Sequence, residues 1–177
     1  MSYSIEPAYT VKNELARIII KAGTEPINKW FFTDGAFSPE FQLENMVNTW
    51  SHENFVVISN KEILGYFEAG WNKSLNVITT FRLILFDKKK SLTVAKAFFQ
   101  YLDYLFICRG ANAFNWTVAL KNHHALRVYE KFIAKKCGHI VGERHNGQMA
   151  YDGEISDIRL FEITRKEYLN YKESLGK

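Results

Sequence analysis

Three strand-like runs follow one another between Asn54 and Phe86, and they constrain the fold more than any other feature of the sequence. The runs NFVVIS, ILGYFEAGW and NVITTFRLILF are rich in β-branched and aromatic residues, and only short polar segments separate them. Strands joined by such short turns pair antiparallel, because a parallel connection needs a crossover of about a dozen residues or more. The sequence therefore predicts an antiparallel meander.

Helical and strand-like patterns alternate after the meander. Apolar residues recur at helical spacing from Ser91, the predicted N-cap, towards Gly110. A strand-like run, AFNWTVAL, is followed by the helical pattern NHHALRVYEKFIAKK and by two further strand-like runs, GHIVGER and SDIRLFEI. Residues 145–155 between these last two runs, HNGQMAYDGEI, are predicted to form a polar loop.

Two helices are predicted ahead of the meander. The first runs from Asn13 to Lys21 and ends at Gly23, and the second runs from Pro39 to about Trp50. The predicted order is α, α, β, β, β, α, β, α, β, β. No repeat or Gly/Pro-rich linker divides the chain, so we expect an α/β (α+β) fold in a single domain over residues 1–177.

The composition excludes several classes of protein. The chain is 47% hydrophobic, which indicates a folded core, and it has no apolar run near the roughly 20 residues that span a bilayer. Its two cysteines, Cys108 and Cys137, lack the number and spacing of a disulfide framework or a zinc site, so no metal is expected. The start of the sequence lacks the pattern of a secretory signal, and we predict a cytoplasmic location.

The phrase WTVALKNHHALRVYEKF carries a motif: Asn122, then Ala125 three residues later, then Tyr129 four residues beyond. Together with the order of elements, this phrase resembles the GNAT superfamily of acetyl-CoA-dependent N-acetyltransferases, from Asn54 to Ile163. The two N-terminal helices match that superfamily more loosely. The resemblance implies a mixed, mostly antiparallel central sheet that is flanked by helices and splayed between its central strands. It also implies that acetyl-CoA, the co-substrate, lies in the resulting wedge.

The resemblance places acetyl-CoA along Ile78 to Phe86 and on the start of the next helix, where unpaired N–H groups favour an anion. The family usually shows Arg or Gln, two residues, Gly, one residue, then Gly or Ala at that loop. The best register here gives Lys90, Thr93 and Ala95, so only the last small residue matches closely. The three lysines at 88–90 either add charge for the phosphates or form a solvated turn. The implied cofactor-binding residues are Leu83, Ile84, Leu85, Phe86, Lys90, Ser91, Leu92, Thr93, Val94, Ala95, Asn122 and Ala125.

Two residues are candidates for proton transfer. The resemblance implies that Tyr129 protonates the departing thiolate, whereas its spacing alone favours a tyrosine at the edge of the core. Glu68, in the second strand of the meander, is a candidate base or a solvent-facing carboxylate. His123 and His124 occupy the first turn of a helix and are expected to be surface residues.

The expected function is acetyl transfer from acetyl-CoA to a primary amine of a small molecule or a protein. The alternative is an inactive GNAT-fold binding or structural protein whose phosphate loop has degenerated. A nucleic-acid partner is disfavoured, because the basic residues are spread along the chain and give a net charge of only +4. The amine acceptor is expected near the N-terminal helices, Trp30–Phe32 and residues 145–155, and the sequence leaves open whether the chain forms a homodimer.

Overall fold

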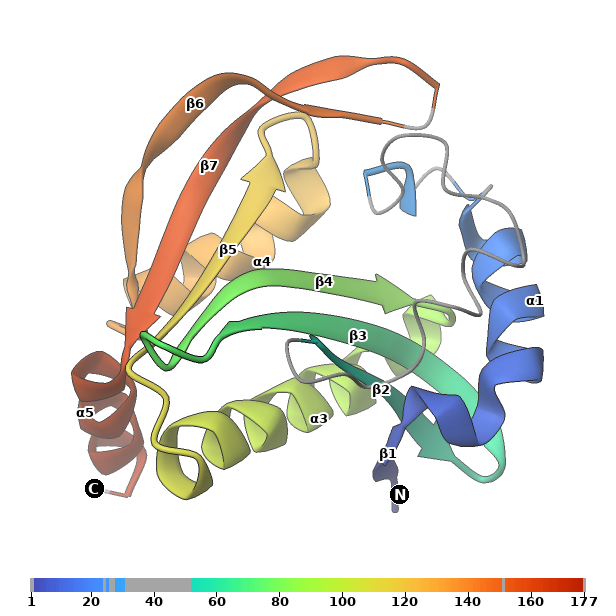
Figure 1. Ribbon diagram of the computed structural model, residues 1–177, viewed down its shortest axis with the longest axis horizontal. Helices are drawn as coiled ribbons and strands as arrows, with labels where there is room; N and C mark the ends of the chain where they lie inside the picture. The colour runs from blue at the N-terminus through green and yellow to red at the C-terminus, as the bar shows by residue number, and fades with distance from the viewer. Residues whose placement is uncertain (1, 24, 26–27, 31–51, 151, 177) are drawn as a thin grey trace.

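The computed structural model describes residues 2–23, 25, 28–30, 52–150 and 152–176. These residues form a seven-stranded sheet in the order β1-β2-β3-β4-β5-β7-β6, in which β4 and β5 are parallel and all other neighbours are antiparallel (Figure 1). The strands are β1 (Ser4–Pro7), β2 (His52–Ser59), β3 (Glu62–Asn72), β4 (Val77–Leu85), β5 (Ala113–Ala119), β6 (His139–Met149) and β7 (Ile155–Thr164). The helices are α1 (Lys12–Gly23), α3 (Ser91–Asp103), α4 (His123–Ala134) and α5 (Arg165–Leu175), with short turns of other helix types at Ala8–Val11, Lys88–Lys90 and Tyr104–Cys108.

Helices cover both faces of the strands β2, β3 and β4. Tyr66 and Ile84 lie in a buried cluster with Leu15 of α1, whereas Phe67 and Phe81 lie in the larger cluster with residues of α3. Adjacent residues of a strand point to opposite faces, so this division follows from the pleat. Figure 1 shows α1 and α3 on either side of the meander, with α4 packed behind β5.

Aromatic side chains connect the two central strands to α3. The ring of Phe81 on β4 lies 5.0 Å from that of Phe114 on β5 and 5.2 Å from that of Phe98 on α3. Phe67 on β3 lies 5.0 Å from Tyr101 of the same helix. Burial of such side chains contributes about 1.5–3 kcal/mol each. The core therefore holds β4 and β5 together near their amino-terminal ends.

The structure confirms the meander, the helices after β4 and β5, and the mixed, mostly antiparallel sheet. The predicted helix at residues 39–50 lies outside the described residues. Two elements were not predicted: β1, a four-residue strand that pairs with β2, and α5, which begins directly at the end of β7. No glycine or proline separates α5 from β7; instead Thr164 and Glu167 form a capping box.

Two local predictions were wrong. Ser91 is the first residue of α3 rather than its cap, and Lys90 at the cap position makes no side-chain cap hydrogen bond. The predicted loop at residues 145–155 is shorter, because β6 continues to Met149. There the ladder is irregular between Arg144 and Gln148, and the carboxylate of Asp157 accepts a hydrogen bond from the N–H of Asn146. This irregularity accommodates polar residues within a strand.

We predict that Gly138→Ala destabilises the protein by about 1–3 kcal/mol. Gly138 has φ +98°, and a Cβ atom there would lie 2.5 Å from the carbonyl oxygen of Glu162 on β7. Gly142, farther along β6, has no heavy atom within 4 Å of such a Cβ and is the matched control. Urea denaturation should show the loss for Gly138→Ala but not for Gly142→Ala; equal midpoints would contradict this account of the β6–β7 pairing.

Candidate active site

The two parallel strands at the centre of the sheet separate almost as soon as they pair. Register pairs join β4 to β5 only at Val77 with Ala113 and at Ile78 with Phe114. Beyond these pairs β4 stays paired with β3, and β5 stays paired with β7. Between these two described strands, the facing edges therefore carry backbone N–H and C=O groups that have no strand partner. Figure 1 shows β4 and β5 spreading apart.

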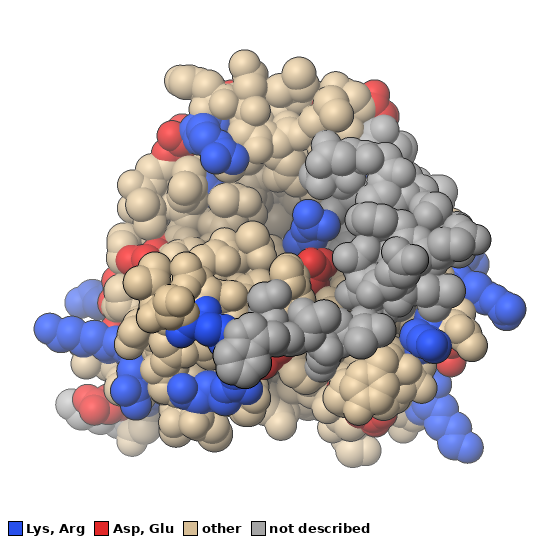
Figure 2. Space-filling model, in the orientation of Figure 1, with Lys and Arg blue, Asp and Glu red and all other residues tan. Residues whose placement is uncertain are grey.

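A cavity of about 550 Å³ lies where the two strands diverge. Its walls come from residues 79–83 of β4, 116–119 of β5, the start of α4, residues 144 and 147–149 of β6, and Asn28 and Trp30. The space-filling view shows the molecule hollowed at this place (Figure 2). Ligand-binding cavities commonly measure about 300–1,000 Å³, so the volume suits a small molecule or one arm of a cofactor.

Tyr129 of α4 lines this cavity, as a catalytic tyrosine would have to do. Its ring is held in place by aromatic neighbours: Trp116 at 5.1 Å, and Phe132 and Phe161 at 5.9 Å each. Burial raises the pKa of its phenol above the ordinary value of 10.0. The hydroxyl has no hydrogen-bond partner within the described part of the chain. It is therefore protonated at neutral pH and available to a ligand.

Asn122 and Ala125, the other two residues of the sequence motif, also line the cavity. The side chain of Asn122 caps α4, because its Oδ1 accepts a hydrogen bond of 3.2 Å from the N–H of Ala125. Ala125 presents only a methyl group to the space beside β4. The spacing of the motif follows from helix geometry: Asn122 caps the first turn at Ala125, and Tyr129 lies about one turn farther along the same face of α4.

The predicted cofactor residues divide into two groups. Leu83 of β4 lines the cavity together with Asn122, Ala125 and Tyr129. Ile84 is buried against α1 on the other face of β4, and Phe86 packs on the same cluster. The remaining predicted residues do not line the cavity: Leu85 is half-buried at the end of β4, and Lys90, Ser91, Leu92, Thr93, Val94 and Ala95 form the start of α3 just beyond it.

The start of α3 already carries a negative charge. The N–H of Lys89 donates a 2.8 Å hydrogen bond to the carboxylate of Asp87, and the N–H of Lys90 donates to the Asp87 carbonyl oxygen. Ser91 and Leu92 are exposed, so the first turn of the helix is open to solvent. The helix amino terminus favours an anion, whereas the Asp87 carboxylate opposes a second one.

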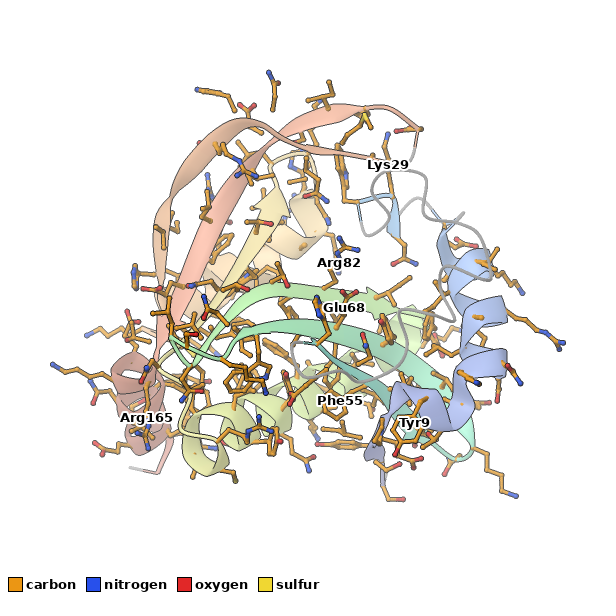
Figure 3. All side chains as sticks on the ribbon, in the orientation of Figure 1. Tyr9, Lys29, Phe55, Glu68, Arg82 and Arg165 are labelled. Carbon is orange, nitrogen blue, oxygen red and sulfur yellow. The ribbon has the colours of Figure 1, made fainter. Side chains whose placement is uncertain are left out.

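Glu68 lies next to the cavity without lining it. It is half-buried on β3, directly across the ladder from Arg82 of β4. Its neighbours Phe67 and Ala69 point to the opposite face, as expected from strand alternation. Figure 3 shows the side chains of Glu68 and Arg82 on the same side of the meander, directed towards the space below β5.

The sequence did not single out Arg82 and Arg144, the two charged residues that line the cavity in the described part of the chain. A signal for Arg82 did exist, because it is the only charged residue in the run NVITTFRLILF. Arg144 lies at the start of the irregular part of β6, next to the residues predicted as a loop. The sequence alone does not reveal that these two side chains reach the same cavity.

Ion pairs fasten residues 28–30 to the turn between β6 and β7. Lys29 pairs with Asp152 at 2.6 Å and also with Glu154, and Lys121 pairs with Glu154 at 2.8 Å. The side-chain amide of Gln148 donates a 2.6 Å hydrogen bond to the carbonyl oxygen of Trp30. Hydrogen bonds from Lys121 and Lys29 lower the pKa of the Glu154 carboxyl group. These contacts hold residues 28–30 beside the β6–β7 turn, where Asn28, Trp30 and Gln148 line the cavity.

Within the described ranges, no cluster of three or more His, Cys, Asp or Glu side chains is arranged to hold a metal ion. None of the described helices is long and apolar enough to cross a membrane.

Comparison with solved structures identifies the fold. A chimera of the Vibrio cholerae spermidine N-acetyltransferase SpeG and hSSAT superposes with a TM-score of 0.76 at 18% identity, over 96% of this chain and 99% of that one. A mutant of the V. cholerae enzyme gives 0.75 at 18% identity, over 96% and 98%. A protein from T. thermophilus, whose name assigns it to the acetyltransferases, gives 0.72 at 17% identity, over 99% and 93%. No family model matches the chain, and no curated protein matches its sequence. The chain therefore has the GNAT fold, as the sequence motif indicated.

We predict that Asn122→Ala lowers the free energy of unfolding by about 1 kcal/mol, the usual value of a helix cap. Asn122→Asp keeps an oxygen that can accept from the Ala125 N–H and should retain most of the stability. Urea denaturation of the three proteins measures both effects. The same stability for Asn122→Ala and the unchanged protein would mean that the cap hydrogen bond contributes nothing to the stability of the fold.

Proposed function

We propose that the protein is an N-acetyltransferase that transfers the acetyl group of acetyl-CoA to a primary amine of a small molecule or a protein. The observation that carries this proposal is the divergence of β4 and β5 over a cavity that Leu83, Asn122, Ala125 and Tyr129 line together. The GNAT fold of the chain agrees with it.

The open edge of β4 fits an amide-bearing chain. Beyond Ile78, alternate N–H and C=O groups of β4 face the space that β5 leaves. The pantetheine arm of CoA carries amide groups of its own, which would pair with this edge as an added strand does. Leu83 and Ala125 supply the apolar contacts beside it. Bound there, acetyl-CoA would supply a thioester whose acetyl carbon is open to attack by an amine.

Two side chains of the protein would handle the protons. Tyr129 keeps its proton at neutral pH, because burial raises its pKa, and it donates that proton to the thiolate that leaves CoA. Glu68 accepts the proton that the attacking amine loses, directly or through one water molecule. Unpaired N–H groups of β4 stabilise the negative charge on the carbonyl oxygen during attack.

The pyrophosphate of CoA would lie on the exposed first turn of α3, at the end of β4. Lys90 and the N–H groups around Ser91 supply positive charge and donors there. Thr93 and Ala95, the residues at the positions of the family's small residues, are both half-buried. The helix start thus offers donors, while the nearby Asp87 carboxylate limits the affinity.

We predict that Ala125→Trp raises the dissociation constant of acetyl-CoA at least about tenfold, because the indole ring would fill the space beside Leu83. Ala134→Trp is the matched control, since Ala134 is exposed at the other end of α4 and does not line the cavity. Calorimetric titration measures both constants. Equal affinities for the two variants would place the cofactor elsewhere.

We predict that Tyr129→Phe lowers kcat by roughly 10- to 100-fold, at or below the usual contribution of a general acid, because a thiolate leaves readily. The phenyl ring keeps the packing against Trp116, so acetyl-CoA affinity and stability should hold. Because the phenol pKa is raised, kcat of the unchanged protein should not fall between pH 8 and pH 10 through loss of this proton. A Tyr129→Phe variant with full kcat would remove Tyr129 from the mechanism.

A second candidate function is a GNAT-fold binding protein without catalysis. The observation that favours it is the start of α3, where no glycine opens the helix and where Asp87 already occupies an amide donor. Under this alternative, thiol release from acetyl-CoA stays at the background rate with every amine tested. Turnover with any amine at a rate that depends on Tyr129 would exclude it.

A further inference from the structure

The lining of the cavity carries positive charge only, as far as the structure describes it. Arg82 reaches it from β4 and Arg144 from β6, while no described aspartate or glutamate lines it. Arg82 lies on an inner strand of the sheet, at a position where β4 pairs with β3 but no longer with β5, and its side chain is exposed. The hollow in Figure 2 has basic side-chain atoms at its edge, with acidic atoms directly beside them.

Both guanidinium groups remain available to a ligand. Arg144 makes a long contact of 3.4 Å to the carbonyl oxygen of Gly147, and Arg82 forms no ion pair with a described carboxylate, although Glu68 stands opposite it in the ladder. The other carboxylates near this end of the sheet already have partners. Glu143 pairs with Arg159, and Asp157 pairs with His145. Lys29 and Lys121 bind the acidic residues of the β6–β7 turn.

This pattern disfavours a polycationic acceptor. Several of the structural neighbours are forms of a spermidine N-acetyltransferase, and spermidine carries several positive charges at neutral pH. Like charges repel, so two arginines that form no ion pair with a described carboxylate oppose such a molecule. An arginine fork instead matches the two oxygens of a carboxylate. Glu68 beside Arg82 disfavours a doubly charged phosphate and suits an ammonium group.

We infer that the acceptor of the proposed acetyl transfer carries a carboxylate besides its amine, as an amino acid or a short peptide does, and that Arg82 and Arg144 bind that carboxylate. The inference rests on the proposed function, since it names the class of its acceptor. Glu68 then lies where the amino group of such a molecule would be held beside its acid group.

The test separates binding from turnover. The probes are N-acetylated alanine, leucine and phenylalanine, each as the free acid and as the carboxamide, with acetylspermidine as the cationic probe. Calorimetry on the protein alone should show at least one acid binding about tenfold or more tightly than its carboxamide, which corresponds to about 1.4 kcal/mol. Arg82→Gln and Arg144→Gln should abolish that difference and leave the carboxamide unchanged within about threefold. Arg127→Gln, an exposed arginine of α4 that does not line the cavity, should preserve it.

Equal binding of acids and carboxamides would overturn the inference, and so would acetylspermidine binding more tightly than the acids. Weaker acetyl-CoA binding in the arginine variants would also overturn it, because the arginines would then bind the cofactor. Failure of the proposed function looks different. In that case the acids bind in an arginine-dependent manner, but neither acetyl-CoA binding nor thiol release with the free amino acids is detected. Preferential acetylation of the free amino acids over their carboxamides and spermidine would support both the proposed function and the inference about its acceptor.

Discussion

The parallel pairing of β4 with β5, limited to two residue pairs, is the constraint on which the rest of the site depends. A parallel pair needs a crossover, and here α3 with its π-helical end supplies it. The crossover begins where β4 ends, so the exposed start of α3 lies beside the open strand edge. A fully paired β4 and β5 would leave neither a cavity nor unpaired backbone donors. The geometry of the site thus follows from the topology.

The aromatic core fixes where the strands part. Phe81 and Phe114 hold β4 and β5 together at the paired end. Farther along β5, the ring of Trp116 packs between Phe114 and Phe161 of β7. Trp116 also supports the ring of Tyr129, so the candidate acid is positioned by the same cluster that stabilises the fold. Three aromatic neighbours pack against the ring of Tyr129, and its hydroxyl has no hydrogen-bond partner among the described residues, so the ring is fixed while the hydroxyl can still reach a ligand.

Local patterns in the sequence were sufficient for most of the fold and for part of the site. Runs rich in β-branched and aromatic residues predicted the meander, and the resemblance of the Asn122, Ala125 and Tyr129 motif to the GNAT superfamily pointed to three residues that the structure brings to one cavity. Arg82 and Arg144 escaped prediction because the strands that bring them to one cavity are far apart in the sequence. The start of α5 was missed because its signal is a capping box rather than a glycine or proline, and the end of β6 was missed because a bulge hides its alternation.

Hydrogen exchange at the backbone of β4, with and without acetyl-CoA, tests the central claim most directly. The account predicts slower exchange in residues 79–86 and at the start of α3 when acetyl-CoA is added, because the unpaired donors of β4 then gain partners. Exchange in α5, which is remote from the cavity, should not change. Unchanged exchange along β4 at saturating acetyl-CoA would contradict the account, since the open edge of the strand would then serve no cofactor.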